Sequence, residues 1–170
     1  MWPTATFGVL FGLLVVAHHR RRVLHFNVTT NPTAEWTARQ VIHAFPEETA
    51  PRFLLRDRDK IYGERYLRAV EALGVEDVVT AARSPWQNPY VERLIGSLRR
   101  ECLDHLIVLD EVHLRRILGR YFAYYSATRC HLSLAGDAPE SRGIQEPELG
   151  RVIEFPEVGG LHHRYERAVA

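Results

Sequence analysis

An apolar run near the start of the chain is the feature that most restricts its fold. Residues 5–17 read ATFGVLFGLLVVA, and a basic stretch, residues 18–22, follows them. A membrane-spanning helix takes about 20 apolar residues, so this run is too short to cross a bilayer. A signal peptide carries its positive charge before its apolar run rather than after it. The run therefore favours a buried β-strand, and we expect no membrane partner. A tethered or exported protein led by residues 5–17 is the less favoured alternative.

The composition is that of a soluble globular domain. The chain is 46% hydrophobic and 25% charged, and 22 basic against 21 acidic residues leave a net charge of +1. Contact with nucleic acid would therefore come from a local patch rather than from a basic tail. The two cysteines, Cys102 and Cys130, form no C-x-x-C pair. A disulfide framework is disfavoured and a cytoplasmic location expected. The close histidine pairs are adjacent residues, which seldom bind one metal together, so a structural zinc site is also disfavoured.

The first half of the chain predicts strands that alternate with helices. Residues 23–29 are rich in β-favouring side chains and predict a second strand, paired with the first around the basic stretch. Asn31 and Pro32 predict the start of a helix, as its cap and its first residue. Residues 53–55 predict a short buried strand that ends in the charged string 56–60. The apolar residues at helical spacing after Pro32 are Ala38, Val41, Ile42 and Phe45.

The second half predicts three more helices. Residues 64–73 carry Leu67, Val70 and Leu73 on one face, and Gly74 is a C-terminal stop. Residues 75–80 predict a strand. The strongest helix signal begins at Asn88 and Pro89, and Asp110 caps a further helix. The expected inward residues of these last two helices are Val91, Leu94, Ile95, Leu98 and Cys102, and then Leu114, Ile117, Leu118, Tyr121 and Tyr125.

This order of elements indicates an α/β fold with a mixed sheet flanked by helices. We place the folded domain at residues 1–134. Residues 135–170 are rich in proline, glycine and charge, and we expect a loosely packed tail there.

Two carboxylates are candidates for chemistry. Asp57 directly follows an apolar strand, at the edge where open α/β sheets place their ligands. Glu92 lies near the start of a helix and out of phase with its apolar stripe. Gly96 leaves room for a phosphate one turn further along, and Arg99 and Arg100 supply positive charge. Carboxylates from a strand end and a helix suit Mg²⁺ or Mn²⁺, and a pair of such ions supports in-line phosphoryl transfer.

Each carboxylate also has a purely structural interpretation. Asp57 would then be a surface turn residue that pairs with Arg56 or Arg58. Glu92 would be a first-turn helix carboxylate that the helix dipole stabilises.

Four stretches resemble the integrase catalytic core of insertion-sequence transposases and, more distantly, that of retroviral integrases. They are HFNVTTNPTAEWTARQ (25–40), FLLRDRDKIYG (53–63), SPWQNPYVERLIGSLRRECLDH (84–105) and YFAYYSATRCHLSL (121–134). The resemblance spans residues 23–142, about 120 of the 170, and is most specific over residues 84–105.

The resemblance implies a ribonuclease H-like fold in which an Asp-Asp-Glu triad binds two magnesium ions. By position, Asp57 is the second aspartate and Glu92 the glutamate, separated by 34 residues, close to the spacing of the triad. Asp59 matches a position that is not catalytic. Asn88 caps its helix and, by the same resemblance, lies beside the active site.

Several other polar or aromatic residues fall inside the resembling stretches. For Trp86, Tyr124 and Tyr125 we favour core packing. For Arg129 and His131 packing and function both stay open.

The resemblance also has a gap. In this family the first catalytic aspartate lies on the first strand, just before a threonine-rich turn. Here that turn is residues 3–6, the chain begins at Met1, and its first acidic residue is Glu35. We therefore expect the first aspartate, most of a central strand and the upstream helix-turn-helix to be missing. The neighbouring strands would then lack ladder partners.

The resemblance implies a DNA transposase or integrase of a mobile element, which hydrolyses a phosphodiester and transfers the strand through a 3′-hydroxyl. We expect Asp57 and Glu92 to bind Mg²⁺ (or Mn²⁺), and Asn88, Arg99 and Arg100 to contact nucleic acid. The expected partners are DNA, both transposon ends and target, and further copies or a full-length transposase. Without the first aspartate, we expect a truncated, weakly active or inactive form. The alternative is a non-catalytic remnant that binds DNA or dimerises with full-length transposase.

Overall fold

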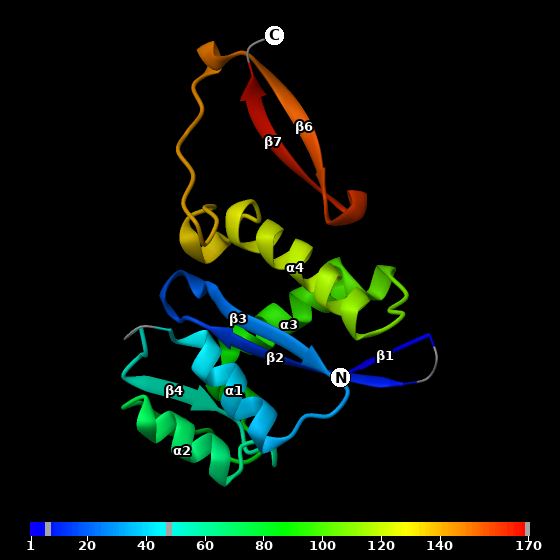
Figure 1. Cartoon of the computed structure of the whole chain (residues 1–170). Helices are drawn as coiled ribbons and strands as arrows, with labels where there is room; N and C mark the ends of the chain where they lie inside the picture. The colour runs from blue at the N-terminus through cyan, green and yellow to red at the C-terminus, as the bar shows by residue number, and fades with distance from the viewer. Residues whose placement is uncertain (6–7, 47–48, 169–170) are drawn as a thin grey trace.

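The computed structural model describes residues 1–5, 8–46 and 49–168 of the chain. Strands and helices alternate in its first part, and two long helices and a β-hairpin follow (Figure 1). The elements are β1 (Trp2–Pro3), β2 (Val9–Val16), β3 (Val23–Thr29), α1 (Ala34–Ala44), β4 (Phe53–Arg56), α2 (Glu64–Ala72), β5 (Glu76–Val79), α3 (Pro89–Glu101), α4 (Glu111–Ala127), β6 (Arg151–Glu157) and β7 (His162–Ala168).

The apolar run forms β2, which pairs antiparallel with β3 from Phe11↔Thr29 to Val16↔Val23. This confirms the predicted hairpin, and the basic stretch forms its turn. Among the described residues, no helix has both the length and the apolar character needed to cross a bilayer.

The described strands form separate hydrogen-bonded sheets rather than one. β1, β2 and β3 make an antiparallel sheet, β4 and β5 pair in parallel, and β6 pairs with β7. β1 contributes only two residues, paired with Val9 and Leu10. The mixed α/β class is confirmed, although the strands do not join into one mixed sheet.

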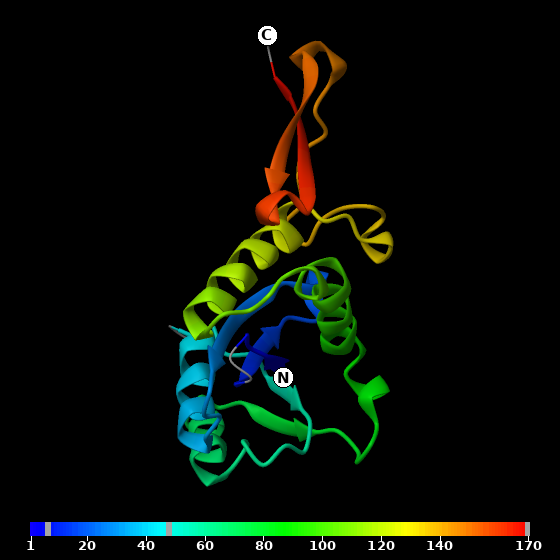
Figure 2. The same cartoon turned by 90° about the vertical axis from the view of Figure 1, so that its right-hand side faces the viewer.

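β2 is buried on both faces, so it lies between two apolar clusters. Leu10 belongs to a cluster with α3 and α4, whereas Leu13 and Val15 belong to a cluster with α1 and α2. Figure 2 shows α3 and α4 on the opposite side of the β2–β3 hairpin from α2. The predicted inward faces of α3 and α4 are confirmed by the burial of Leu94, Leu98, Cys102, Leu114, Ile117, Leu118, Tyr121 and Tyr125.

The start of α1 differs from the prediction. Asn31 and Pro32 precede the helix, and Thr33 is its cap, with its side-chain oxygen accepting a hydrogen bond from the Trp36 amide at 3.1 Å. A threonine cap satisfies one of the unpaired amides at a helix start as an asparagine does. The prediction of Asn31 as the cap is therefore wrong; it followed the common pattern of an asparagine cap before a proline at the first helical position.

Several apolar residues expected to point inward are exposed instead. Ile42 and Leu67 are exposed on α1 and α2, and Phe53 is exposed on β4. Tyr66 is buried on α2, because the helix turns that residue rather than Leu67 toward the core. Trp86 is 70% exposed, so the preference for core packing at this residue is wrong. For Tyr124 and Tyr125 it is right, since both pack on the cluster around α3 and α4.

An ion pair joins the end of α3 to the segment that follows α4. Arg129 donates from Nε and Nη2 to the two carboxylate oxygens of Glu101, at 2.8 and 2.6 Å, and the Tyr121 hydroxyl donates to the same carboxylate at 3.0 Å. Burial works against the charge of Glu101, but the hydrogen bonds and charge of Arg129 outweigh it and lower the pKa of this carboxyl. Arg129 therefore has a structural role, which sequence analysis left open.

The segment after α4 is also held by the basic turn between β2 and β3. Arg20 donates to the Asp137 carboxylate at 2.6 Å and to the backbone oxygen of Pro139 at 2.8 Å. Hydrogen bonds from Ser141 and Arg20 lower the pKa of Asp137 to about 2.

Residues 151–168 form a β-hairpin that projects away beyond α4 in both views (Figures 1 and 2). Sequence analysis predicted a loosely packed tail here and did not predict these two strands. The inner end of the hairpin contacts the helices, because Val158 is buried in their cluster and the His162 ring stacks on Tyr124 at 4.4 Å between centroids. The division between residues 1–134 and 135–170 stays a prediction.

Shortening Leu98 should lower the free energy of unfolding by about 2–5 kcal/mol, because Leu98→Ala leaves a cavity where α3 meets α4. Leu98 is fully buried. Urea denaturation of the whole chain measures the effect. Leu132→Ala is the matched control: Leu132 is almost wholly exposed, and we expect a change within about 0.5 kcal/mol. Equal losses in both variants would contradict this packing.

Because of the Glu101–Arg129 pair, the free energy of unfolding should fall as the pH is lowered into the acid range. The pKa of Glu101 is lowered in the folded chain from its ordinary value of 4.5. The ionised carboxylate therefore adds stability above that value, and the contribution is lost as the pH falls through the lower, folded pKa. Wild type should lose more stability below about pH 4.5 than Glu101→Gln does, as measured by urea midpoints across this range.

The control for this pH dependence is Glu35→Gln. Glu35 forms an exposed pair with Arg39 one turn away on α1, and such pairs contribute at most about 1 kcal/mol. This variant should keep the wild-type pH profile. A Glu101→Gln profile parallel to that of wild type would show that the pair does not set the acid response.

Candidate functional site

A cavity of about 1070 Å³ lies between β2 on one side and β4 with its following turn on the other. One face of α3, from Val91 to Arg99, also lines it. Asp57, Asn88, Glu92 and Arg99 are among the lining residues, and Arg100 is not. The structure thus brings both candidate carboxylates to one cavity.

Asp57 is presented by a tight turn directly after β4. Its Oδ1 accepts a hydrogen bond from the Asp59 amide at 3.0 Å, and the Asp59 carboxylate in turn accepts from the Ile61 amide at 3.1 Å. Both aspartates are exposed. Each side chain fixes the backbone two residues ahead, as aspartates in turns commonly do, so the chain leaves the strand in a defined direction.

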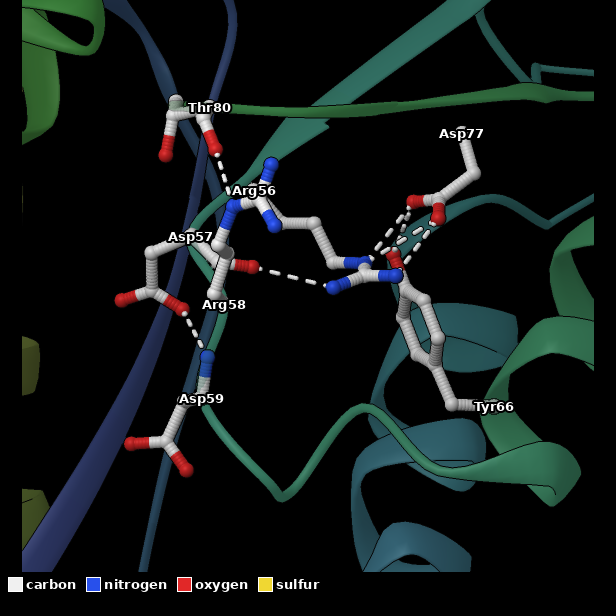
Figure 3. A network of polar contacts seen from close by, with 7 residues as sticks. All are labelled: Arg56, Asp57, Arg58, Asp59, Tyr66, Asp77 and Thr80. Atoms are coloured by element: carbon white, nitrogen blue, oxygen red, sulfur yellow. Dashed lines mark hydrogen bonds and ion pairs between the residues drawn. The ribbon is translucent and has the colours of Figure 1, made fainter. Parts of the chain in front are cut away.

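A polar network behind the turn holds the end of β4 (Figure 3). Arg56 donates to the Asp77 carboxylate from Nε at 3.0 Å and from Nη2 at 2.8 Å, and the Tyr66 hydroxyl donates to Asp77 at 3.2 Å. Arg56 also donates to the backbone oxygen of Asp57 at 3.0 Å. Arg58 donates to the backbone oxygen of Thr80 at 2.9 Å, which ties the turn to the end of β5.

This network bears on one part of the structural interpretation of Asp57, the expected pairing with a neighbouring arginine. If Asp57 were only a surface turn residue, its carboxylate would pair with Arg56 or Arg58. Arg56 instead pairs with Asp77, and the Asp57 carboxylate points away from that guanidinium (Figure 3). The expected pairing of Asp57 with Arg56 is therefore absent, and the hydrogen bond from the Asp59 amide keeps Asp57 in the turn.

The carboxylates influence the tyrosine beside them. Burial raises the pKa of the Tyr62 hydroxyl, and the charges of Asp57 and Asp59 raise it further. The Tyr62 ring also lies under the Arg56 guanidinium, 4.9 Å from its centroid. Tyr62 therefore stays protonated and neutral near neutral pH.

Glu92 lies in the first turn of α3, and its side chain is exposed. Among the described residues its carboxylate has no ion-pair or hydrogen-bond partner. Asn88 is at the cap position of α3, as predicted. Its side chain makes no capping hydrogen bond, so the prediction that this side chain caps the helix is wrong. The backbone oxygen of Asn88 still accepts the Glu92 amide at 3.2 Å.

The two candidate phosphate contacts lie on different sides of α3. Arg99 lines the cavity, and the Arg100 side chain covers Gly96, where an added Cβ would come within 3.1 Å of Arg100 Nη1. The expected open space beside Gly96 is thus partly filled by Arg100.

The donors at this cavity suit a hard divalent cation but are few. No cluster of three or more histidine, cysteine, aspartate or glutamate side chains stands close enough to hold a metal within the ranges that the structure describes. Asp57 and Glu92 both offer carboxylate oxygen, the donor that Mg²⁺ and Mn²⁺ prefer. Mg²⁺ is often held by one or two carboxylates with water and phosphate completing its shell, so the residues present fit such an ion.

Sequence analysis missed the residues that position this site. Asp77 was read only as part of a strand and Tyr66 was not singled out, although both hold Arg56. The alternating arginine and aspartate residues at the end of the strand were the available signal, but they did not reveal which charges pair.

The sequence did not decide between packing and function for His131. The structure buries its side chain, which is 6% exposed, and its Nε2 has no partner among the described residues. Burial and the charge of Arg129 lower the pKa of His131.

Comparisons with known proteins agree with this architecture. Residues 73–139 match the family model of the integrase core domain. No curated protein matches the chain. Among solved structures, the chain is similar to one chain in the cryo-EM structure of the simian T-cell lymphotropic virus intasome in complex with the PP2A regulatory subunit B56 gamma. That match has a TM-score of 0.60 and 14% sequence identity, and covers 91% of this chain and 59% of the other.

These matches confirm the resemblance to an integrase catalytic core and the mixed α/β, ribonuclease H-like fold. The matched segment includes α3 and α4 and therefore Glu92, whereas Asp57 precedes it. The chain spans about three fifths of the solved chain to which it is similar.

Replacing Asp77 should loosen the turn that carries Asp57. Asp77→Asn places an amide against the Arg56 guanidinium, and we expect a loss of about 1–3 kcal/mol in unfolding free energy. NMR relaxation should show lower backbone order parameters for residues 57–61. Glu76→Gln is the control, because Glu76 is the exposed neighbour of Asp77 on β5. Unchanged order parameters in Asp77→Asn would show that the network does not position Asp57.

Proposed function

We propose that this chain is a transposase or integrase core that acts on DNA in integration or transposition, and that Asp57 and Glu92 are its metal-binding carboxylates. One observation carries the proposal: the two carboxylates, which come from the end of β4 and the start of α3, line the same cavity. The integrase core match over residues 73–139 supports it.

The chain's own residues would act by placing a phosphodiester beside the carboxylates. Arg99 lines the cavity and can contact a phosphate there, and Asn88 offers an amide at the entrance to α3. Arg100 would contact phosphate outside the cavity. Phosphate contacts of this kind position DNA without reading its sequence. A bound Mg²⁺ or Mn²⁺ would supply charge that stabilises the attacking and leaving oxygens.

The proposal includes low activity for this chain. Two carboxylates neutralise less charge than a triad does and hold two ions poorly. We therefore expect weak metal binding and little or no strand transfer, in partnership with DNA and with further copies or a full-length transposase. The second candidate, a module that binds DNA or a full-length transposase without catalysis, is favoured because the described residues include no group of three or more histidine, cysteine, aspartate or glutamate side chains that could hold a metal.

Metal binding tests the carboxylates. In calorimetric titrations with Mn²⁺, Asp57→Asn and Glu92→Gln should each weaken binding by about tenfold or more, equivalent to about 1.4 kcal/mol. Asp104→Asn is the control, because Asp104 is an exposed acid that does not line the cavity. Wild-type affinity in both cavity variants would remove the proposed site. DNA binding without any Mn²⁺ binding would favour the second candidate.

Salt dependence tests the arginines. We expect Arg99→Ala and Arg100→Ala each to lower the slope of log K for duplex DNA against log salt by about one. Arg39→Ala, on α1, should leave the slope unchanged.

A joining assay tests the expected low activity. Incubation of the chain with labelled donor ends and Mg²⁺ should give little joined product, and efficient joining would contradict the expected low activity.

A further inference from the structure

The strand β7 of the C-terminal hairpin has an open edge. Within the described parts of the chain, β7 pairs with β6 alone. The Arg167 amide donates to the Gln145 side chain at 2.6 Å instead of to β6, so it points to the outer side of the strand. The backbone groups of successive residues in an antiparallel strand point to alternate sides. His163 and Tyr165 therefore direct their amides and carbonyls to the same outer side as Arg167.

The hairpin that carries this edge has little of its own to stabilise it. It projects beyond α4 in both views (Figures 1 and 2), and its inner end contacts the helices through Val158 and His162. Val152 and Tyr165, on its strands, are 56% and 55% exposed. A sheet of two strands is at best marginally stable in water, and three or more strands are needed for independent stability. A further strand beside β7 would therefore stabilise the projecting hairpin.

We propose that β7 pairs antiparallel with β7 of a second copy of this chain, around a two-fold axis at Tyr165. Tyr165 of each copy exchanges both backbone hydrogen bonds with Tyr165 of the other, and His163 does so with Arg167, whose amide leaves Gln145. The two hairpins then form one four-stranded sheet. Such pairing supplies a surface for the further copies expected under the proposed function, on which it rests in this respect. It involves neither Asp57 nor Glu92.

The charges along β7 are complementary in this pairing. With the axis at Tyr165, Arg164 of each copy lies directly opposite Glu166 of the other. These positions form the pairs without backbone hydrogen bonds, in which the Cα atoms are only about 4.5 Å apart. Opposite charges across such a pair are stabilising, and the two exposed Tyr165 rings meet at the axis as an aromatic pair. Arg164 and Glu166 already lie on one face of the hairpin, 2.9 Å apart within one copy.

Other arrangements of the same hairpin are less complementary. If the axis moves one residue along β7, Arg164 faces Arg164 of the other copy or Glu166 faces Glu166, and like charges at opposite positions are destabilising. Pairing through β6 centred on Glu154 opposes two carboxylates, and Pro156 of β6 has no amide to donate. A two-fold interface requires a surface that is complementary to itself. The edge of β7 around Tyr165 meets this requirement.

Charge complementation in the whole chain, without DNA or metal, tests the pairing. Arg164→Glu and Glu166→Arg are made as separate variants, and sedimentation equilibrium measures the mass of wild type, of each variant and of their equimolar mixture over a dilution series. In either variant alone, like charges face each other across the axis. In the mixture, each introduced charge faces an opposite charge on the other variant. Mixing does not change ion pairs within one copy, so these cannot produce the effect.

We expect wild type to dimerise, each variant alone to dimerise about tenfold or more weakly, and the mixture to recover most of the wild-type affinity. Arg151→Glu is the matched control, because Arg151 is an exposed arginine of β6, and it should dimerise as wild type does. A wild type that stays monomeric up to about 1 mM would overturn the proposal. A mixture that associates no more tightly than the separate variants would do the same.

A second variant makes the test independent of these side-chain charges. Tyr165→Pro removes an amide that faces the second copy and leaves the bonds to β6 in place, since proline is tolerated on edge strands. It should weaken the dimer by about tenfold or more. In wild type, amide exchange at His163 and Tyr165, followed by NMR, should slow as the concentration of the chain rises.

Dimerisation that Tyr165→Pro leaves unchanged would assign the contact to another surface and overturn the proposal. Dimerisation of wild type with unchanged exchange at His163 and Tyr165 would do so too. These results do not depend on the Mn²⁺ titrations, so a failure of the proposed metal site and a failure of this pairing are told apart.

Discussion

The burial of β2 on both faces is the constraint on which the rest of the structure depends. Leu10 on one side and Leu13 and Val15 on the other anchor two separate apolar clusters. One cluster fixes α3 and α4, and the other fixes α1, α2 and the turn into β4. Glu92 and Asp57 belong to these two halves of the molecule, so the packing of a single strand explains why both line one cavity.

The candidate site is therefore assembled from rigid elements and held by charges that do not themselves take part in it. Arg56 and Asp77 fix the end of β4 behind Asp57, and the Glu101–Arg129 pair fixes the far end of the helix that carries Glu92. In both places the stabilising arginine is engaged by a partner outside the cavity. Neither of these arginines forms its ion pair with Asp57 or Glu92.

Periodicity and capping patterns predicted the hairpin of β2 and β3 and the two long helices, because these features are local and repeat along several turns. The choice of Thr33 over Asn31 as a cap, and the exposure of Trp86, depend on tertiary contacts that a local pattern does not contain. The hairpin of β6 and β7 escaped prediction for a similar reason: glycine, proline and charge suggested a loose tail, whereas Val158 and His162 anchor it through contacts with distant helices. For the site, sequence suggested the carboxylates, but the partner of Arg56 lies 21 residues further along the chain.

The contact of His162 with α3 links the C-terminal hairpin to the helix that carries Glu92. His162 Nε2 lies 2.8 Å from the backbone oxygen of Glu101, at the last residue of the helix that begins near Glu92. The projecting hairpin is therefore tied to the last turn of the helix whose first turn carries Glu92.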